Sequence, residues 1–379
     1  YLRMKICIIS FWTSNNNYGQ LFQGYALQNY LRQQGHDVYH LKYRTRKVQR
    51  PLLIQYIIKS IKFIINPYKK IKAIKANNLR CNHDEIRDFI SFRNLYMNFS
   101  TIEYNGTDSL KKNPPIADYY ITGSDQVWAQ LISKKDNRAF YLDFGEKKTN
   151  KIAYAASFAM TQYPKELLPD LRQLLLKFKK IGVRENDGIN ICKNIGINAI
   201  LVPDPTILFK GEDYRKLSTP ISKLKKFAFI YSLNINNPQQ IYWETLSPFI
   251  NQKALNTVVT TADGLIPACE IFEAQYIYAT PNEWLWLIDN AEFVITASFH
   301  GIIFSILMNT PFVYIPLQNV KAGMNNRVIL LLKDLGLENR ICYAKEQIKP
   351  ILDTEINWSK VNMTINEMRE TGKSFLNFQ

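Results

Sequence analysis

The chain has 379 residues, of which 46% are hydrophobic and 13% aromatic, a composition that indicates packed globular domains and excludes a disordered protein. Two domains of ordinary size are expected at this length, and no apolar run is long enough for a membrane span or arranged as a signal peptide. The five cysteines are scattered, without a CxxC motif or a Cys/His cluster, so we expect reduced thiols and no metal site.

The first half of the chain alternates apolar strands with amphipathic helices. It opens as strand, loop, helix and strand, like a Rossmann-like domain, although it lacks a GxGxxG motif. We expect strands over 5–12, 36–43, 118–122, 152–158, 180–183 and 199–202, and helices over 19–34, 85–95 and 164–178.

A basic segment, residues 42–80, interrupts this pattern. It contains twelve Lys or Arg and no acidic residue, and so accounts for most of the net charge of +16. Bulky apolar residues run through it, which suits the surface of an anionic membrane. A solvated helical insertion that packs on its own domain is the structural alternative. Nucleic acid would also attract the charge, but no recognised binding motif accompanies it, so we expect no nucleic-acid partner.

The second half repeats the α/β pattern. Thr280, Pro281 and Glu283 form a strong helix start, with an N-cap, a proline in the first turn and a capping box. Strands are expected over 227–233, 257–260, 293–295 and 312–315, and helices over 239–250, 284–290, 301–308, 325–336 and 359–375. We therefore predict an α/β, GT-B-like fold with two Rossmann-like domains facing a cleft, over 1–205 and 206–358, and a C-terminal helix (359–379) that returns to the first domain.

Polar loops follow several of the predicted strands. One carries His300, among only four histidines, between an apolar strand and an apolar helix, where anions bind in α/β folds. The loops together offer a guanidinium, an imidazole, carboxylates and hydroxyls. They lack a carboxylate pair, a metal cluster and a P-loop, which argues against glycoside, metal-assisted and ATP hydrolysis.

These loops carry, in order, six motifs that resemble those of the polysaccharide pyruvyl transferases. They are Asn17-Tyr18-Gly19-Gln20 with Tyr25-Ala26-Leu27-Gln28, Gly123-Ser124-Asp125-Gln126-Val127-Trp128, Tyr154-Ala155-Ala156-Ser157-Phe158, Val183-Arg184-Glu185, Pro203-Asp204-Pro205-Thr206, and Thr296-Ala297-Ser298-Phe299-His300-Gly301. Relatives often have Asp where this chain has Ala297, which removes one candidate carboxylate.

The resemblance implies transfer of pyruvate from phosphoenolpyruvate, a co-substrate rather than a cofactor, to a sugar, as a ketal. Arg184 and His300 would bind the donor, helped by Ser298, Phe299, Gly301 and, at a helix start, Arg327. His300 is also a candidate general acid, and Asp125 a candidate base. The predicted acceptor-binding residues are Asn17, Tyr18, Gln20, Ser124, Gln126 and Trp128.

Structural interpretations remain open for several of these residues. Arg184 could pair with Glu185 at the surface, Asp125 could cap a turn, and Arg327 could be structural. Asp204 between two prolines is more typical of a turn or hinge, and Trp284 and Trp286 of a core. Tyr18 and Trp128 are the rings expected to face the cleft and to stack on a sugar.

The predicted protein is therefore a pyruvyl transferase for a capsule, exopolysaccharide or other surface glycan. It would act on the polysaccharide or its lipid-linked precursor, in the cytoplasm, docked on the inner face of the membrane through residues 42–80. A GT-B glycosyltransferase that uses a nucleotide sugar is one alternative, and it would bind UDP or GDP. A non-catalytic glycan-binding relative is the other.

Overall fold

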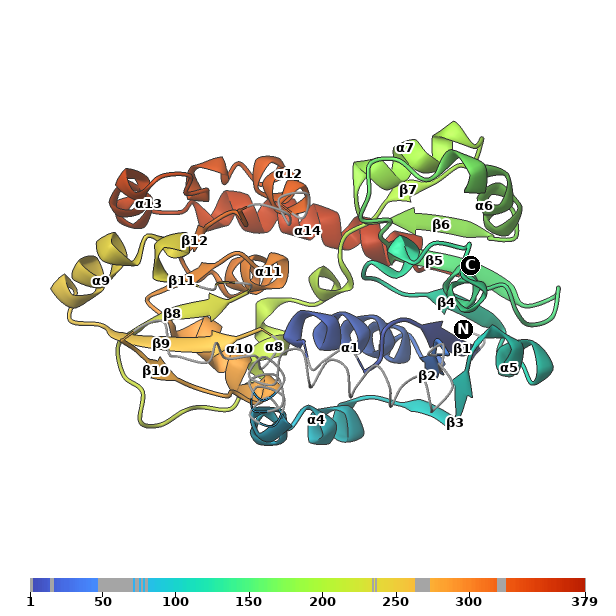
Figure 1. The fold of residues 1–379 in the computed structure, drawn as a ribbon, viewed down its shortest axis with the longest axis horizontal. Coiled ribbons are helices and arrows are strands. Elements are labelled where there is room, and N and C mark those ends of the chain that lie inside the picture. The colour runs from blue at the N-terminus through green and yellow to red at the C-terminus, as the bar shows by residue number, and fades with distance from the viewer. Residues whose placement is uncertain are drawn as a thin grey trace.

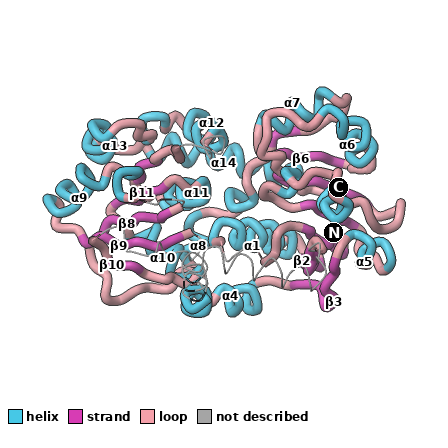
Figure 2. The backbone as a smooth tube through the Cα atoms, viewed as in Figure 1, coloured by secondary structure: helices cyan, strands magenta, loops and turns pink. Residues whose placement is uncertain are grey.

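The computed structural model describes residues 3–13, 17–46, 81–233, 235, 237–262, 273–318 and 325–378, together with Ile71, Lys75 and Asn78. Most of the basic segment lies outside the described residues, so the interpretations of that segment stay predictions. Two groups of strands, each flanked by helices, lie at opposite ends of the molecule (Figures 1 and 2).

The first sheet is parallel throughout and has the strand order β3-β2-β1-β4-β5-β6-β7. Its central strands are buried on both faces, which is typical of an α/β sheet. The strands are β1 (Lys5–Ile9), β2 (Asp37–Arg44), β3 (Phe99–Asn105), β4 (Tyr119–Thr122), β5 (Asn150–Ala156), β6 (Lys180–Val183) and β7 (Ile200–Leu201).

The second sheet is also parallel, with the order β10-β9-β8-β11-β12. Successive strands are added on one side of β8 up to β10 and on its other side from β11 onward, so the strand order reverses between β8 and β11. Such switch points are where α/β sheets bind ligands. The strands are β8 (Phe227–Ser232), β9 (Asn256–Thr261), β10 (Gln275–Tyr276), β11 (Phe293–Thr296) and β12 (Phe312–Tyr314).

Helices follow most of the strands and cover the two sheets. In the first half they are α1 (Tyr18–Gln33), α4 (Phe89–Tyr96), α5 (Thr107–Lys112), α6 (Leu168–Leu175) and α7 (Asn186–Asn194), with short 3-10 turns η1 (Val127–Ala129), η2 (Lys135–Tyr141), η3 (Lys165–Leu167) and η4 (Pro205–Leu208). In the second half they are α8 (Gly211–Arg215), α9 (Trp243–Gln252), α10 (Pro281–Asn290), α11 (Phe299–Met308), α12 (Asn326–Asp334), α13 (Ile348–Asp353) and α14 (Trp358–Phe375), with η5 (Pro238–Ile241), η7 (Glu338–Arg340) and η8 (Lys345–Gln347).

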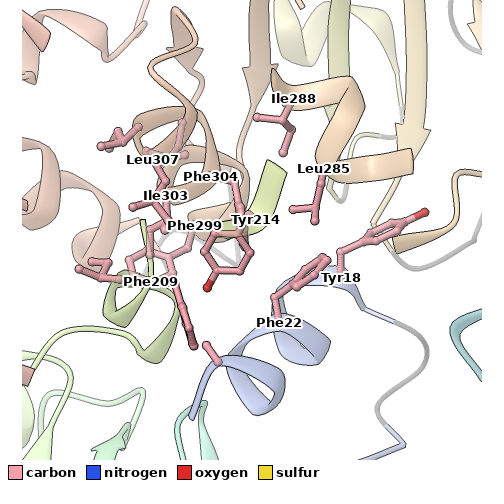
Figure 3. Packing of buried hydrophobic residues seen from close by; sticks show 14 of the residues in the cluster. Tyr18, Phe22, Phe209, Tyr214, Leu285, Ile288, Phe299, Ile303, Phe304 and Leu307 are labelled. Carbon is pink, nitrogen blue, oxygen red and sulfur yellow. The ribbon is translucent and has the colours of Figure 1, made fainter. Parts of the chain in front are cut away.

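A continuous apolar core joins the two halves, because α1 of the first half packs on α10 and α11 of the second (Figure 3). Tyr18 stacks on Trp284, with ring centroids 5.1 Å apart and planes 9° apart, and Phe22 lies 5.2 Å from Phe304. Aromatic pairs of this kind add stabilisation beyond the area that they bury. The core therefore fixes α1 against the second sheet.

The C-terminal helix α14 runs from the second half back to the first sheet, as predicted (Figure 1). Buried Arg369 donates to the carbonyl oxygens of Ile207 and Phe209, at 2.8 and 3.2 Å. Phe375 packs on Tyr154 of β5. These contacts, with the two parallel sheets, confirm the predicted α/β class with two Rossmann-like sheets and a returning helix.

Two predicted helices are each divided into a 3-10 turn and an α-helix. Residues 164–178 begin with η3 before α6, and Pro169 in the first turn of α6 has no N–H to continue the preceding turn. Residues 239–250 are divided at Tyr242, whose φ of 54° is left-handed. None of the helices that the structure describes combines the length and the hydrophobicity that a membrane span requires.

Candidate functional site

Loops at the carboxyl ends of both sheets meet at Asp204. This residue follows β7, lies between two prolines, and caps η4 by accepting from the Thr206 N–H at 3.1 Å. Its side chain is 0% exposed, yet its Oδ2 lies 3.1 Å from Nη1 of the Arg184 guanidinium and 3.4 Å from Nε2 of the His300 imidazole. Asp204 thus shapes a turn, as the sequence indicates, and also holds two predicted donor-binding residues together.

The ion pairs decide the charge state of Asp204. Burial alone would raise the pKa of this carboxyl group. His300, Arg184 and the Thr206 hydroxyl act in the opposite direction and hold the pKa well below its usual range. Asp204 is therefore a buried carboxylate whose charge is compensated by its partners.

His300, in the second half of the chain, is buried against Asp204 and Gly19 of the first half. It lies in the first turn of α11, and its side chain is only 10% exposed. A Cβ added at Gly19, in the first turn of α1, would lie 2.1 Å from His300 Nδ1, so only glycine permits this approach. Among the described residues that line the two cavities defined below, His300 does not appear.

The structure brings several other predicted residues into the same network. Ser124 Oγ donates to Gln23 Oε1, which also accepts from Arg184 Nη1 at 3.3 Å. Asp125 adopts a left-handed φ of 90° and accepts from Gln20 Nε2 at 2.5 Å. The interpretation of Arg184 as a surface ion pair is wrong, because its side chain is 3% exposed.

Two further predicted site residues, Asn17 and Ser298, are the N-caps of helices. The Asn17 side chain accepts from the Gln20 N–H at 3.2 Å and begins α1. Ser298 accepts from the Gly301 N–H at 3.3 Å and begins α11. Both therefore shape the backbone at the site.

The prediction that two aromatic rings face the cleft is wrong. Tyr18 is 0% exposed, and its hydroxyl donates to the Ala279 carbonyl at 2.5 Å. Trp128 is also 0% exposed, stacks on Tyr141, and donates to the Phe140 carbonyl at 3.0 Å. Both rings complete cores, since a large aromatic surface next to a strand end is stabilised most by burial. Trp284 is a core residue, as the sequence indicates.

Two guanidinium groups lie on the ring of Phe299. Arg184 Cζ is 5.3 Å and Arg327 Cζ is 5.0 Å from the ring centroid. Arg184 Nε and Nη2 and Arg327 Nε are buried without a hydrogen-bond partner in the described part of the chain. Planar donors without partners are suited to a carboxylate or a phosphate.

The two arginines differ in how their charge is compensated. Burial lowers the pKa of Arg184, but Asp204, Glu185 and Asp125 more than offset this and raise it. Burial, followed by repulsion from Arg184, lowers the pKa of Arg327 to about 10. An anion placed beside Arg327 would therefore relieve an unfavourable charge.

Two cavities open at this place and share a wall. The smaller, of about 230 Å³, is lined by Arg184, Asp204, Phe299 and Arg327 and by residues of α14. The larger, of about 390 Å³, lies beyond the ends of β4 and β5 and is lined by Gln126 among others. Glu185, Arg327 and Leu330 line both cavities.

Sequence reasoning missed Glu185, which it treated only as an ion-pair partner of Arg184. The signal was its place directly after a strand, at the start of a helix. In the described part of the chain, no group of three or more His, Cys, Asp or Glu side chains is suited to a metal ion.

The fold is similar to that of solved structures with low sequence identity to this chain. The chain is similar in structure to a UDP-GlcNAc 2-epimerase from Methanocaldococcus jannaschii, at 10% identity and a TM-score of 0.53 over 98% of this chain and 99% of that one. It is also similar to a UDP-N-acetylglucosamine 2-epimerase from Rickettsia bellii, at 13% identity and a TM-score of 0.49 over 99% and 95%. At these identities the likeness concerns the fold alone, and the similarity to the Methanocaldococcus jannaschii protein agrees with a GT-B-like arrangement. No match was found among curated protein sequences.

The family model described as polysaccharide pyruvyl transferase matches residues 17–319. This range includes Arg184, Glu185, Asp204 and the start of α11, the loops that meet between the sheets. The match covers most of the chain, and the chain therefore belongs to the polysaccharide pyruvyl transferase family.

Proposed function

We propose that the protein transfers pyruvate from phosphoenolpyruvate to two hydroxyl groups of one sugar, forming a ketal and releasing phosphate. The observation that carries this proposal is the pair of buried guanidinium groups, Arg184 and Arg327, with N–H groups free beside one cavity. Phosphoenolpyruvate has both a carboxylate and a phosphate, and arginine binds each with paired hydrogen bonds. The larger cavity would then take the sugar.

Titration calorimetry with phosphoenolpyruvate, beside UDP, GDP and CDP, tests the donor. We expect the wild type to bind phosphoenolpyruvate, and Arg184→Lys to bind it at least roughly tenfold more weakly. Lysine keeps the positive charge next to Asp204 but lacks the paired N–H donors of the guanidinium group. Arg215→Lys is the matched control, since Arg215 pairs with Asp289 away from both cavities. Binding of a nucleotide without any response to phosphoenolpyruvate would instead support the glycosyltransferase alternative.

We also propose that the acceptor is lipid-linked and that the enzyme docks on the anionic inner face of a membrane. The basic composition of residues 42–80 supports this proposal. The helical stretch that follows contains Ile86, 58% exposed, and Ile90 of α4, 66% exposed. Exposed apolar side chains next to a basic segment suit insertion between lipid headgroups.

Replacing four lysines of the basic segment with glutamine should weaken binding to phosphatidylglycerol-containing vesicles at least tenfold, since each lysine near such a surface is worth about 1 kcal/mol. The four are Lys69, Lys70, Lys72 and Lys75. A control variant with the same loss of charge replaces four exposed lysines from other parts of the surface, Lys165, Lys223, Lys333 and Lys349. Co-sedimentation measures both, and an equal loss in the control would contradict docking through this segment.

A further inference from the structure

The Glu185 carboxylate has one oxygen in use and one free. The residue follows β6 directly and is the N-cap of α7. Its Oε1 accepts from the Phe158 N–H at 3.1 Å, which fixes the side chain. Its Oε2 is buried and receives no hydrogen bond from any described residue, and Arg184 Nε lies 3.8 Å away. A buried carboxylate oxygen without a donor is costly unless something occupies the position beside it.

Glu185 also stands where the two cavities meet. It lines the smaller cavity, where the guanidinium groups gather, and the larger cavity at the ends of β4 and β5. Its side chain is 11% exposed, so the residue lies in the cavity walls rather than on the outer surface. A group transferred between the two cavities would pass the wall that Glu185 shares with Arg327 and Leu330.

The other carboxylates near the cavities are less suited to accept a proton from a sugar. Asp125 accepts from Gln20 through one oxygen and from the Gln126 N–H, at 2.8 Å, through the other. Asp204 is 0% exposed and bound on both oxygens. Asp187 lines only the larger cavity, and Asp334, which is exposed, lines only the smaller one.

We propose that Glu185, rather than Asp125, is the general base that deprotonates the acceptor hydroxyl; this inference rests on the proposed function. The hydroxyl oxygen bonds to C2 of phosphoenolpyruvate, its proton passes to Glu185 Oε2 and from there to solvent, and C3 takes a proton from solvent to become a methyl group. The bond from C2 to the phosphate oxygen then breaks, and the second hydroxyl bonds to C2 and loses its proton. Of the two hydroxyl protons, one replaces the proton given to C3 and the other leaves with phosphate, so Glu185 ends the cycle as a carboxylate.

The test separates donor binding from catalysis. Glu185→Gln keeps an oxygen for the Phe158 N–H but cannot take a proton. We expect it to bind phosphoenolpyruvate as tightly as the wild type or more tightly, because a negative charge is lost. Phosphate release with a panel of p-nitrophenyl hexosides and N-acetylhexosaminides should fall roughly 100- to 10,000-fold. Glu338→Gln, which changes an exposed carboxylate that lines neither cavity, is the matched control and should stay within about threefold of the wild type.

A second variant tests the chemical role directly. In Glu185→Ala, added formate should restore part of the phosphate release, since a small carboxylate can occupy the vacated space and accept the proton. A purely structural role would not respond to formate. Unchanged phosphate release by Glu185→Gln would overturn the role of Glu185 while leaving the transferase intact. A wild type that binds no phosphoenolpyruvate and releases no phosphate with any glycoside would overturn the proposed function, and this role with it.

Discussion

An Asp204→Ala variant is expected to unfold at a clearly lower urea concentration than the wild type, with a loss of about 3–5 kcal/mol. The reason is that Arg184, 3% exposed, would keep its charge in the interior after its partner 3.1 Å away is removed. The Thr206 N–H would also lose its acceptor. Urea unfolding followed by tryptophan fluorescence measures this loss, and a change below about 1 kcal/mol would contradict the ion-pair assignment.

Asp204→Asn isolates the charge, because the amide oxygen can still accept from Thr206. The pKa of Asp204 is held well below its usual range in the folded protein. Its contribution to stability is therefore fully present above the unfolded-state pKa of about 3.9 and is lost as the pH falls through the folded-state value. Between about pH 5 and pH 2 the unfolding midpoint of the wild type should fall more steeply than that of Asp204→Asn. Parallel pH profiles of the two proteins would contradict this expectation.

Most strands of the fold could be predicted from the sequence, because each buried parallel strand is a short apolar run between polar loops. The strand β8 (Phe227–Ser232) is buried at every position, and its prediction is confirmed. The edge strand β3 (Phe99–Asn105) was missed, since only Tyr104 in it is buried and its apolar residues form neither a continuous run nor a regular alternation. Edge strands depend on pairing with a neighbour more than on their own pattern.

The site could be predicted only in part, because residue type indicates chemistry but not partners. Arg184, Phe299 and Arg327 were predicted at the donor site, and the structure brings them together. The contact of Asp204 with His300 joins residues 96 positions apart, and no local pattern encodes it. The burial of Tyr18 follows likewise from the packing of α1 on α10, a tertiary contact.

Arg327→Met is expected to lower affinity for phosphoenolpyruvate roughly 100-fold while leaving the ligand-free protein as stable as the wild type or more stable. The Arg327 guanidinium is beside Arg184, and burial with this repulsion lowers its pKa to about 10. A cation whose pKa is lower in the folded state costs stability at every pH below the folded value, and the cost disappears only as the pH rises toward the unfolded value. Methionine removes that cost and can still pack on Phe299.

Arg340→Met is the contrasting control. Arg340 is also buried, but its guanidinium donates to the carbonyl oxygens of Ile351, at 2.6 Å, and of Thr354. Its loss should lower the unfolding midpoint and leave phosphoenolpyruvate affinity unchanged, because it lines neither cavity among the described residues. Calorimetry of phosphoenolpyruvate binding and urea unfolding of both variants distinguish an arginine that binds the ligand from one that stabilises the fold. If Arg327→Met lost stability as Arg340→Met does and still bound phosphoenolpyruvate normally, Arg327 would be structural, and the donor site would rest on Arg184 alone.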